Sequence, residues 1–275
     1  MSASSMTHHT GATSRRVLVT GVSSGLGRAL VHALLASGAA VVGVARRAAL
    51  GGELEAEVDS ANFRFVAADI AQVEGCRRAI EACTSAFGGI DVLINNAGAR
   101  TTPPMVPLHE LDEKNWDTVV DTNLKGPFFL TRYALPTMIE QGYGLIINVS
   151  SQTAEQATTG MAAYSSSKAG LLGLTRSIAV EYLDQGIRAL SIVLGGTDTG
   201  QPERTMATER VAASTSTGDF RPMLYPADAV ARTIALLTQD DAATITGASI
   251  AIDHATTAGA LTSAYIQEVI RRAQP

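Results

Sequence analysis

Short apolar runs alternate with helical stretches along most of the chain, and this alternation limits the fold more than any other feature. The runs expected to form strands are residues 16–20, 41–45, 63–68, 91–95, 144–150, 187–194 and 249–253. Apolar positions recur with helical spacing over residues 25–37, 48–58, 73–87, 111–141, 163–185 and 227–238. A helix between two strands returns the chain to the same end of the sheet. The sequence therefore predicts an α/β fold, with a parallel sheet covered by helices on both faces.

The chain is expected to form one domain with a tail. Its composition, 46% hydrophobic and 17% charged over 275 residues, is that of a folding chain. No linker divides it, so we expect a disordered tail over residues 1–14 and a single dinucleotide-binding domain over 15–275. Residues 197–226 are rich in Thr, Ser and Gly and are interpreted as a substrate loop. Residues 258–275 form a C-terminal extension with helical apolar spacing, which we expect to pack on its own subunit.

Composition and charge also exclude several classes of protein. A formal net charge of −5 argues against nucleic acid as the main partner, because phosphate binding needs a basic face. The most apolar stretch, residues 29–45, is too interrupted to span a membrane. The five histidines form no ligand-spaced cluster, and Cys76 and Cys83 are expected to be buried thiols, so no metal site is predicted. The first fourteen residues contain no apolar core for a signal peptide, which favours a cytoplasmic location.

A glycine-rich motif follows the first expected strand and opens the first expected helix. It reads Thr-Gly-Val-Ser-Ser-Gly-Leu-Gly over residues 20–27. Glycines at such a turn allow close backbone approach, and the helix N-terminus then faces a bound phosphate. The spacing departs from the common dinucleotide fingerprint, and an ordinary glycine-rich turn is the alternative. The strand–turn–helix context nevertheless favours a dinucleotide site.

A second motif places a tyrosine and a lysine one helical turn apart. Tyr164 and Lys168 share a helix face because residues four apart are neighbours there. Tyrosine has a pKa of about 10, and a nearby cation lowers that pKa by favouring the phenolate. Random placement of the chain's six tyrosines and three lysines would give only about 0.07 such pairs. The pair is therefore interpreted as an acid–base group rather than as a chance surface pair.

Together, these motifs resemble the short-chain dehydrogenase/reductase family in its compact single-domain subgroup. The matches occur in the family's order over nearly the whole chain: residues 20–27, Asp69, residues 95–98, Asn123, Ser150 and Ser151, Tyr164 with Lys168, and residues 196–199. The resemblance implies a Rossmann-type doubly wound sheet of about seven strands in the order 3-2-1-4-5-6-7. It also implies a homo-oligomer, a tetramer or a dimer, formed through the long helices that include the helix of Tyr164.

The resemblance assigns roles to individual residues. Tyr164 is expected to be the general acid in ketone reduction and the base in the reverse direction. Lys168 lowers the pKa of Tyr164 and binds the nicotinamide ribose, Ser151 holds the substrate oxygen, and Asn123 positions a relay water. Ser150, by contrast, is expected to be structural. The expected cofactor-binding residues are Gly21, Ser23, Ser24, Gly25, Leu26, Gly27, Arg46, Asp69, Ile70, Asn95, Ala97, Gly98, Tyr164, Lys168, Thr197 and Thr199.

The end of the second strand indicates which cofactor is used. An acidic residue there would bind the ribose 2′-hydroxyl of NAD, but Ala45 occupies that position and Arg46 follows it. A guanidinium suits a 2′-phosphate, so the sequence predicts NADP(H) in preference to NAD(H). The alternative is that Arg46 and Arg47 are solvated loop residues.

The predicted function is an NADP(H)-dependent oxidoreductase that interconverts a ketone and a secondary alcohol. Two alternatives stay open: a non-catalytic cofactor-sensing or scaffold protein on the same fold, and a tailoring or epimerising reductase of a biosynthetic pathway. Arg100 could meet an acidic substrate group, although a solvated side chain is the favoured interpretation. Two departures from the family pattern are Gly195, where a proline is usual, and His254 with Ala255, where two glycines are usual. The missing proline is expected to loosen the segment that follows.

Overall fold

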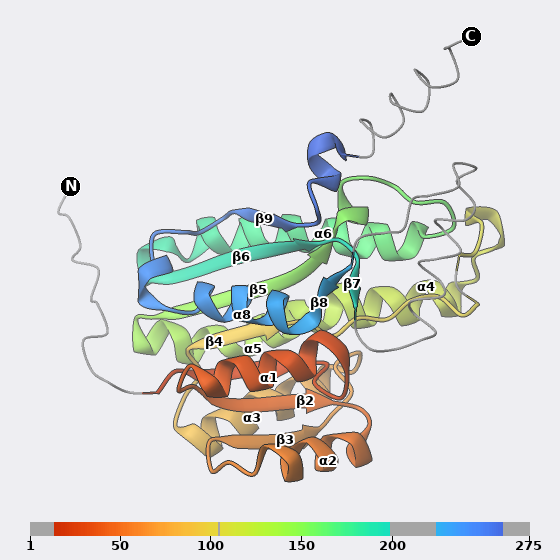
Figure 1. Ribbon diagram of the computed structural model, residues 1–275. Coiled ribbons are helices and arrows are strands. Elements are labelled where there is room, and N and C mark those ends of the chain that lie inside the picture. Colours follow the sequence, from red (N-terminus) through yellow and green to blue (C-terminus); the bar gives the residue numbers. More distant parts are fainter. Residues whose placement is uncertain (1–13, 104, 199–223, 261–275) are drawn as a thin grey trace.

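Seven parallel strands form the central sheet, in the order β3-β2-β1-β4-β5-β6-β9 (Figure 1). The computed structural model describes residues 14–103, 105–198 and 224–260. The strands of the sheet are β1 (Arg16–Thr20), β2 (Ala40–Ala45), β3 (Phe63–Ala67), β4 (Val92–Asn95), β5 (Gly144–Ser151), β6 (Ile187–Leu194) and β9 (Ser249–Ile252). Two short strands, β7 (Thr197–Asp198) and β8 (Tyr225–Pro226), pair separately. The parallel, doubly wound sheet expected from the sequence is confirmed.

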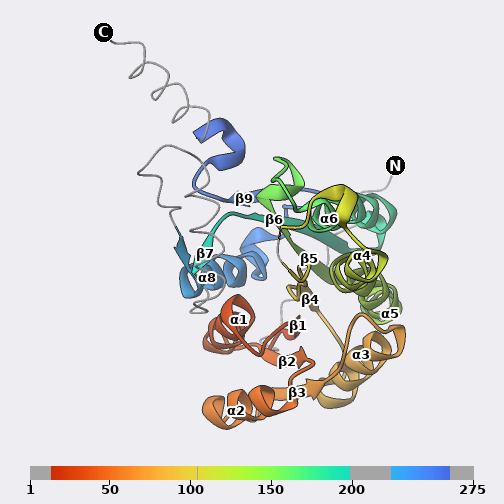
Figure 2. The ribbon, with the colours of Figure 1, turned by 90° about the vertical axis from the view of Figure 1, so that its right-hand side faces the viewer.

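Helices cover both faces of the sheet (Figure 2). The α-helices are α1 (Gly25–Ala36), α2 (Ala48–Val58), α3 (Val73–Phe87), α4 (Glu113–Val120), α5 (Gly126–Gln141), α6 (Ala162–Glu181) and α8 (Ala227–Leu237). Short 3-10 turns are η1 (Leu108–Glu110), η3 (Gln152–Ala154), η4 (Leu183–Gln185) and η5 (Asp240–Ala242), and π-helical turns are η2 (Asp121–Lys125) and η6 (Thr256–Ala260). Helices α1, α2 and α8 lie on one face, and α3, α5 and α6 lie on the other.

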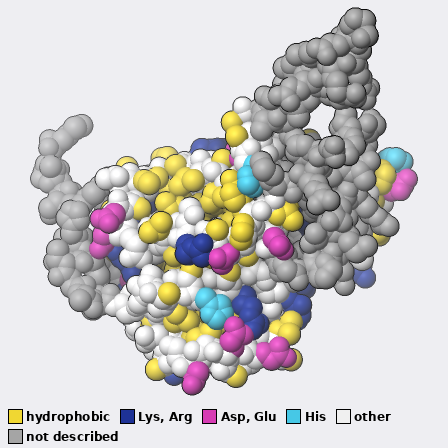
Figure 3. Space-filling model, in the orientation of Figure 1, with side chains coloured by type: hydrophobic (Ala, Val, Ile, Leu, Met, Phe, Trp, Pro, Cys, Tyr) yellow, Lys and Arg dark blue, Asp and Glu magenta, His cyan; other side chains and the backbone are white. Residues whose placement is uncertain are grey.

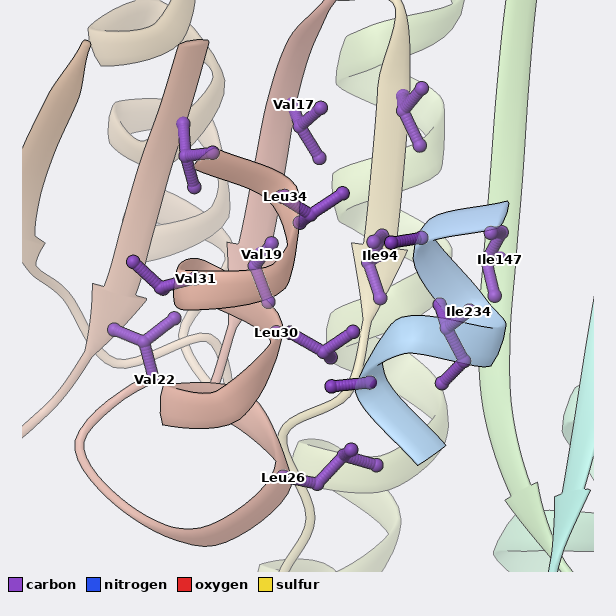
Figure 4. Packing of buried hydrophobic residues seen from close by; sticks show 14 of the residues in the cluster. Val17, Val19, Val22, Leu26, Leu30, Val31, Leu34, Ile94, Ile147 and Ile234 are labelled. Atoms are coloured by element: carbon purple, nitrogen blue, oxygen red, sulfur yellow. The ribbon is translucent and has the colours of Figure 1, made fainter. Parts of the chain in front are cut away.

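The two-residue period of the strands divides the core into two apolar layers. Val17 and Val19 of β1 pack toward α1 and α8 (Figure 4), whereas Leu18 between them packs toward the opposite helices. All three side chains are fully buried. Strands covered on both faces read as continuous apolar runs, and this is why β2, with the sequence AVVGVA, is buried at every position.

The order of the strands places a crevice at the carboxyl ends of the strands. β1 lies between β2 and β4, so the chain winds outward in one direction through β2 and β3 and then crosses back to β4. In doubly wound sheets, ligands bind outside the carboxyl ends of the strands at this reversal. Thr20, Asn95 and Ser151 end their strands at this edge.

The structure divides one stretch that the sequence predicts as mostly helical, residues 111–141. Asp112 caps α4 by accepting a hydrogen bond from the backbone N–H of Asn115 at 2.6 Å. The chain then widens into the π-helical turn η2 before α5 begins. The helix expected over residues 163–185 ends at Glu181 and continues as the turn η4, closed by Gly186 in the left-handed conformation.

Other expectations concern the surface and the thiols. Cys76 and Cys83 are both buried, and burial raises the pKa of the two thiols to about 11 and about 12. Trp116 and Phe128 are 40% and 47% exposed, so they are not core residues of this chain. Acidic and basic side chains are interspersed on the face shown in Figure 3.

Among the helices of the described residues, none has the length and apolar character that a membrane span requires. Residues 1–13 of the tail expected over 1–14, and residues 261–275 of the C-terminal extension, lie outside the described residues.

Candidate active site

A cavity of about 470 Å³ opens at the carboxyl ends of the strands, where the topology places the crevice. One end is formed by the loop between β1 and α1, and the other by β5 and the start of α6. The predicted site residues that line it are Gly21, Ser23, Ser24, Leu26, Gly27, Arg46, Asp69, Ile70, Ala97, Gly98, Ser151, Tyr164, Lys168 and Thr197. The fold thus brings the glycine motif and the Tyr–Lys motif, separated by about half the chain, into one cavity.

The glycine motif forms a turn that side chains would block. Gly21 has φ +79°, and its backbone N–H donates to the Val44 carbonyl at 2.7 Å. A Cβ on Gly27 would lie only 2.1 Å from the Gly21 carbonyl oxygen. Gly25 does not line the cavity; it has φ +55° at the first position of α1 and lets the chain turn into the helix. Each glycine is therefore required by backbone geometry.

The N-terminus of α1 lines the cavity without a side-chain cap. Ser24 precedes the helix without capping it through its side chain, and the first turn contains no acidic residue. Backbone N–H groups in the first turn of a helix lack partners within the helix and carry the positive end of its dipole. This end of the cavity is built to receive an anion such as a pyrophosphate.

Two arginines follow β2, and they behave differently. Arg46 is exposed at the rim of the cavity, which it helps to line. Arg47 donates to the hydroxyls of Ser23 at 2.8 Å and Ser24 at 2.9 Å, and so ties the β2 loop to the glycine loop. Arg47 is therefore not simply a solvated loop residue. The one carboxylate among the described lining residues is Asp69, whose Oδ1 accepts from the Ala71 N–H at 3.1 Å.

The segment after β4 is fastened to the end of β1. The Thr20 hydroxyl accepts from the backbone N–H groups of Asn96 at 3.1 Å and Ala97 at 3.0 Å. The Asn96 side chain donates to the Thr20 carbonyl at 2.8 Å. These bonds hold Ala97 and Gly98 on the cavity wall, between the glycine loop and Tyr164.

Asn95, expected to bind cofactor, lies behind the cavity wall, and Asn96 lies on the wall instead. Asn95 ends β4 with its side chain directed along the sheet, where it donates to Asn148 of β5 at 2.8 Å. Asn148 in turn donates to Thr175 of α6 at 2.9 Å. All three residues are buried, so this chain of hydrogen bonds braces the sheet against the helix that presents Tyr164.

Tyr164, Lys168 and Ser151 meet at the other end of the cavity. The Lys168 ammonium lies 5.7 Å from the centre of the Tyr164 ring and donates to the Val149 carbonyl at 2.8 Å. Ser151 lines the cavity and accepts from the Thr153 N–H at 3.2 Å. Ser150 differs: its hydroxyl is turned into the protein and donates to the Lys168 carbonyl at 2.9 Å. The pair of serines therefore offers one hydroxyl to the cavity and one to the core.

The environment of Tyr164 favours its ionised form. Burial, the largest influence, raises the Tyr164 pKa, but the positive charges of Lys168 and Arg100 lower it. Hydrogen bonds with Ser151 and Arg100 lower it further, and the pKa ends below that of a free tyrosine. For Lys168, burial lowers the pKa, the neighbouring Tyr164 raises it, and the net direction is downward. Lys168 and Tyr164 thus form a coupled acid–base pair.

Asn123 occupies the π-helical turn η2, behind Gly98. Its side chain accepts from the Ala99 N–H at 2.6 Å and donates to the Ala99 carbonyl at 3.0 Å and the Ser167 hydroxyl at 3.1 Å. A Cβ on Gly98 would lie 3.7 Å from the Asn123 oxygen and 3.8 Å from the Lys168 nitrogen. The missing side chain of Gly98 therefore leaves open the space between these two groups.

The two departures from the family pattern meet at the base of the loop after β6. The Gly195 N–H donates to the Ile252 carbonyl at 2.9 Å, and a Cβ there would lie 2.7 Å from the Asp253 Cα. A proline could make neither this hydrogen bond nor this close approach. His254 stacks on Tyr225 with ring centres 3.6 Å apart, and it holds φ +54° at the turn where the family usually has glycine. The described part of this segment is thus tied to β9 and β8.

Of the two threonines expected to bind cofactor, the structure describes Thr197 but not Thr199. Thr197 lines the cavity, and its hydroxyl oxygen is buried without a hydrogen-bond partner among the described residues. A buried polar atom facing a cavity is suited to a bound group. Thr199, and most of the expected substrate loop, lie outside the described residues.

Comparison with known proteins identifies the class. The family model for short chain dehydrogenases matches residues 15–210, and the chain belongs to this family of oxidoreductases. It is 34% identical to the short chain dehydrogenase/reductase astE of Aspergillus oryzae, over 86% of this chain and 92% of that protein. It is 35% identical to cis-4-hydroxycyclohexanecarboxylate dehydrogenase of Sinomonas cyclohexanicum, over 89% and 97%. A 3-ketoacyl-(acyl-carrier-protein) reductase from Brucella melitensis, solved with NADH, has a TM-score of 0.78 at 28% identity, over 87% and 96%. The resemblance seen in the sequence is confirmed.

Sequence reasoning missed two parts of the site. The sequence interpretation of Arg47 includes no contact with the glycine loop, although the position of Arg47 next to Arg46 points to that loop. The interpretation of Arg100 as a solvated side chain, or as a contact for an acidic substrate group, does not link it to Tyr164 either. No sequence spacing relates Arg100 to Tyr164, because the contact is created by the packing of β4 against β5 and α6.

Proposed function

We propose that this chain is an NADP(H)-dependent oxidoreductase that interconverts a ketone and a secondary alcohol, with Tyr164 as general acid and base. One observation carries the proposal: Tyr164, Lys168 and Ser151 share a cavity with a glycine loop and an open helix N-terminus. Consumption of NADPH in the presence of ketones tests it. Consumption that continues unchanged without the Tyr164 hydroxyl would contradict it.

The residues present fit a nicotinamide dinucleotide. The cradle around Gly21 and Gly27 would lose its shape if either carried a side chain. The Thr197 hydroxyl, which has no hydrogen-bond partner among the described residues, lies at the other end of the cavity. The α1 N-terminus with Ser23 would hold the pyrophosphate, Asp69 the adenine end, and Thr197 the carboxamide. When bound, the cofactor supplies or accepts the two electrons of the reaction.

The protein's own part in the reaction is the movement of a proton. Ser151 donates a hydrogen bond to the substrate oxygen and so fixes its position beside the Tyr164 hydroxyl. In reduction, Tyr164 gives its proton to that oxygen as negative charge develops there; in oxidation, the phenolate removes the alcohol proton. Lys168, buried one turn along α6, stabilises the phenolate in both directions. Asn123 and the open space beside Gly98 provide a path for a water that returns the proton to Lys168.

The cofactor preference rests on the loop after β2. Ala45 is followed by Arg46 at the cavity rim, and the one carboxylate among the described lining residues, Asp69, belongs to the segment after β3. Arg46 and the Arg47–Ser23–Ser24 cluster supply donors for a 2′-phosphate, whereas no carboxylate of the described β2 loop is placed to bind a 2′-hydroxyl.

Arg46→Asp is therefore expected to weaken NADPH binding by tenfold or more, which corresponds to about 1.4 kcal/mol, while NADH binding changes little. A carboxylate would repel the 2′-phosphate and could accept from a 2′-hydroxyl. Fluorescence titration with each cofactor measures this, and Arg78→Asp, exposed on α3 and outside the cavity lining, is the matched charge control. An equal loss of affinity for both cofactors would remove Arg46 from the preference.

Self-association is proposed on the helices that the family uses. Exposed apolar side chains lie on α4, α5 and α6: Trp116 is 40%, Ile139 41% and Val180 80% exposed. Burial of such side chains between two copies would be favourable. Light scattering of the purified chain is expected to give a dimer or tetramer mass, and a monomer mass at micromolar concentration would contradict the proposal.

A further inference from the structure

Tyr164 has a second cationic neighbour besides Lys168. The guanidinium carbon of Arg100 lies 5.3 Å from the centre of the Tyr164 ring, closer than the Lys168 ammonium at 5.7 Å. The two charges come from different elements, since Lys168 belongs to α6 and Arg100 follows β4. Both side chains line the cavity with Tyr164.

Arg100 makes no ion pair within the described part of the chain. The cations of the ion pairs there are other arginines, two histidines and Lys125. Asp69, the one lining carboxylate described, lies at the end of the cavity proposed for the adenine. Lys168 is buried and donates to a backbone carbonyl, whereas Arg100 is exposed and its described partner is the phenol of Tyr164. An arginine over an aromatic face is held by the charge of the ring, and its donors can reach the hydroxyl.

We propose that Arg100 is a second positioning residue for Tyr164: it holds the phenol toward the cavity and, with Lys168, stabilises the ionised form. The groups that face Tyr164 are Lys168 from its own helix, Ser151 from β5 and Arg100 from the segment after β4. The kinetic part of this inference rests on the proposed role of Tyr164, but the effect on ionisation does not.

The sign of the effect follows from charge. Both cations favour the phenolate, so removal of the Arg100 charge raises the Tyr164 pKa. Alcohol oxidation uses the phenolate, and its rate therefore rises with pH through that pKa. Ketone reduction uses the phenol, and its rate falls through the same pKa. Loss of Arg100 therefore shifts the pH dependence of both reactions to higher pH. At a pH below the Tyr164 pKa, the rate of alcohol oxidation falls tenfold for each pH unit by which that pKa rises.

Phenolate absorbance in the cofactor-free protein tests the inference without any substrate. We would titrate the wild type, Arg100→Gln and Arg100→Lys, each against the same protein carrying Tyr164→Phe, so that the difference isolates Tyr164. The expected midpoint is highest in Arg100→Gln, with Arg100→Lys between Gln and wild type. The control is Arg132→Gln, because Arg132 stacks on Tyr133 at 5.6 Å outside the cavity lining. A wild-type midpoint in Arg100→Gln would overturn the inference, as would identical midpoints in the Gln and Lys variants.

Kinetic measurements on the Arg100 variants distinguish a positioning role from general damage to the site. At a fixed pH below the Tyr164 pKa, Arg100→Gln is expected to have a lower kcat for alcohol oxidation than the wild type. Its ketone reduction is expected to stay active up to a higher pH than that of the wild type. An equal fall in the rates of oxidation and reduction, with no shift in the pH dependence of either, would overturn the inference, because it would indicate general damage to the site. If the wild type turns over no substrate, the proposed function fails, and the absorbance midpoints still decide the role of Arg100.

Discussion

Tyr164→Phe is expected to lower kcat/KM for ketone reduction by about 10²–10⁴-fold while leaving NADPH affinity near that of the wild type. The substitution removes only the hydroxyl that delivers the proton. The ring, its contact with Lys168 and the shape of the cavity wall are retained. Steady-state rates with a turned-over ketone, together with an NADPH titration, measure the two effects separately.

The matched control for this result is Tyr133→Phe. Tyr133 lies on α5, packs at the edge of the apolar layer and does not line the cavity. Loss of its hydroxyl is expected to leave kcat/KM within about twofold of wild type, because that hydroxyl lies outside the cavity and the ring that packs on the core is kept. Full activity in Tyr164→Phe would place the proton donor elsewhere.

Gly27→Ala is expected to destabilise the fold by about 1–3 kcal/mol and to weaken NADPH binding by more than tenfold. The new methyl group would lie 2.1 Å from the Gly21 carbonyl oxygen, which is a backbone atom and cannot swing aside. The glycine loop must therefore shift away from the α1 N-terminus that would bind the pyrophosphate. Denaturant unfolding and cofactor titration measure the two consequences.

Gly52→Ala provides the control for the same chemical change in a helix. A Cβ at Gly52, in α2, meets nothing within 4 Å. Alanine there is expected to stabilise the protein by about 0.5–1 kcal/mol, because glycine is unfavourable inside helices. If Gly27→Ala behaves like Gly52→Ala in both stability and cofactor binding, close packing of the glycine loop does not control the site.

The sheet could be predicted from sequence because its signals are local. Buried parallel strands read as apolar runs, and runs separated by helical stretches leave few arrangements for a doubly wound sheet. The break at Asp121–Lys125 could not be placed this way, because helical periodicity continues on both sides of η2. Asn123 was a partial signal, since asparagine disfavours a regular helix, but only tertiary hydrogen bonds to Ala99 and Ser167 fix the π-helical turn.

The candidate site divides in the same way. Tyr164 and Lys168 could be paired from sequence because four residues make about one helical turn. Asn95 could not be told from Asn96, because both follow one strand and only the packing of β4 on β5 directs Asn95 to Asn148. Arg100 and Arg47 make contacts across separate elements. No spacing in the sequence indicates the contact of Arg100, and only the position of Arg47 beside Arg46 points to the glycine loop. Gly195 looked like a loosening substitution, yet its N–H bonds β9 where a proline could not.

The central claim, a dinucleotide site that prefers NADP(H), is tested most directly by parallel fluorescence titrations of the purified wild-type protein with NADPH and NADH. The account predicts saturable binding of both cofactors, with NADPH bound at least tenfold more tightly. Tighter binding of NADH would contradict the role of the arginines after β2. Binding of neither cofactor would contradict the assignment of the glycine loop and the α1 N-terminus, and with it the proposed reaction.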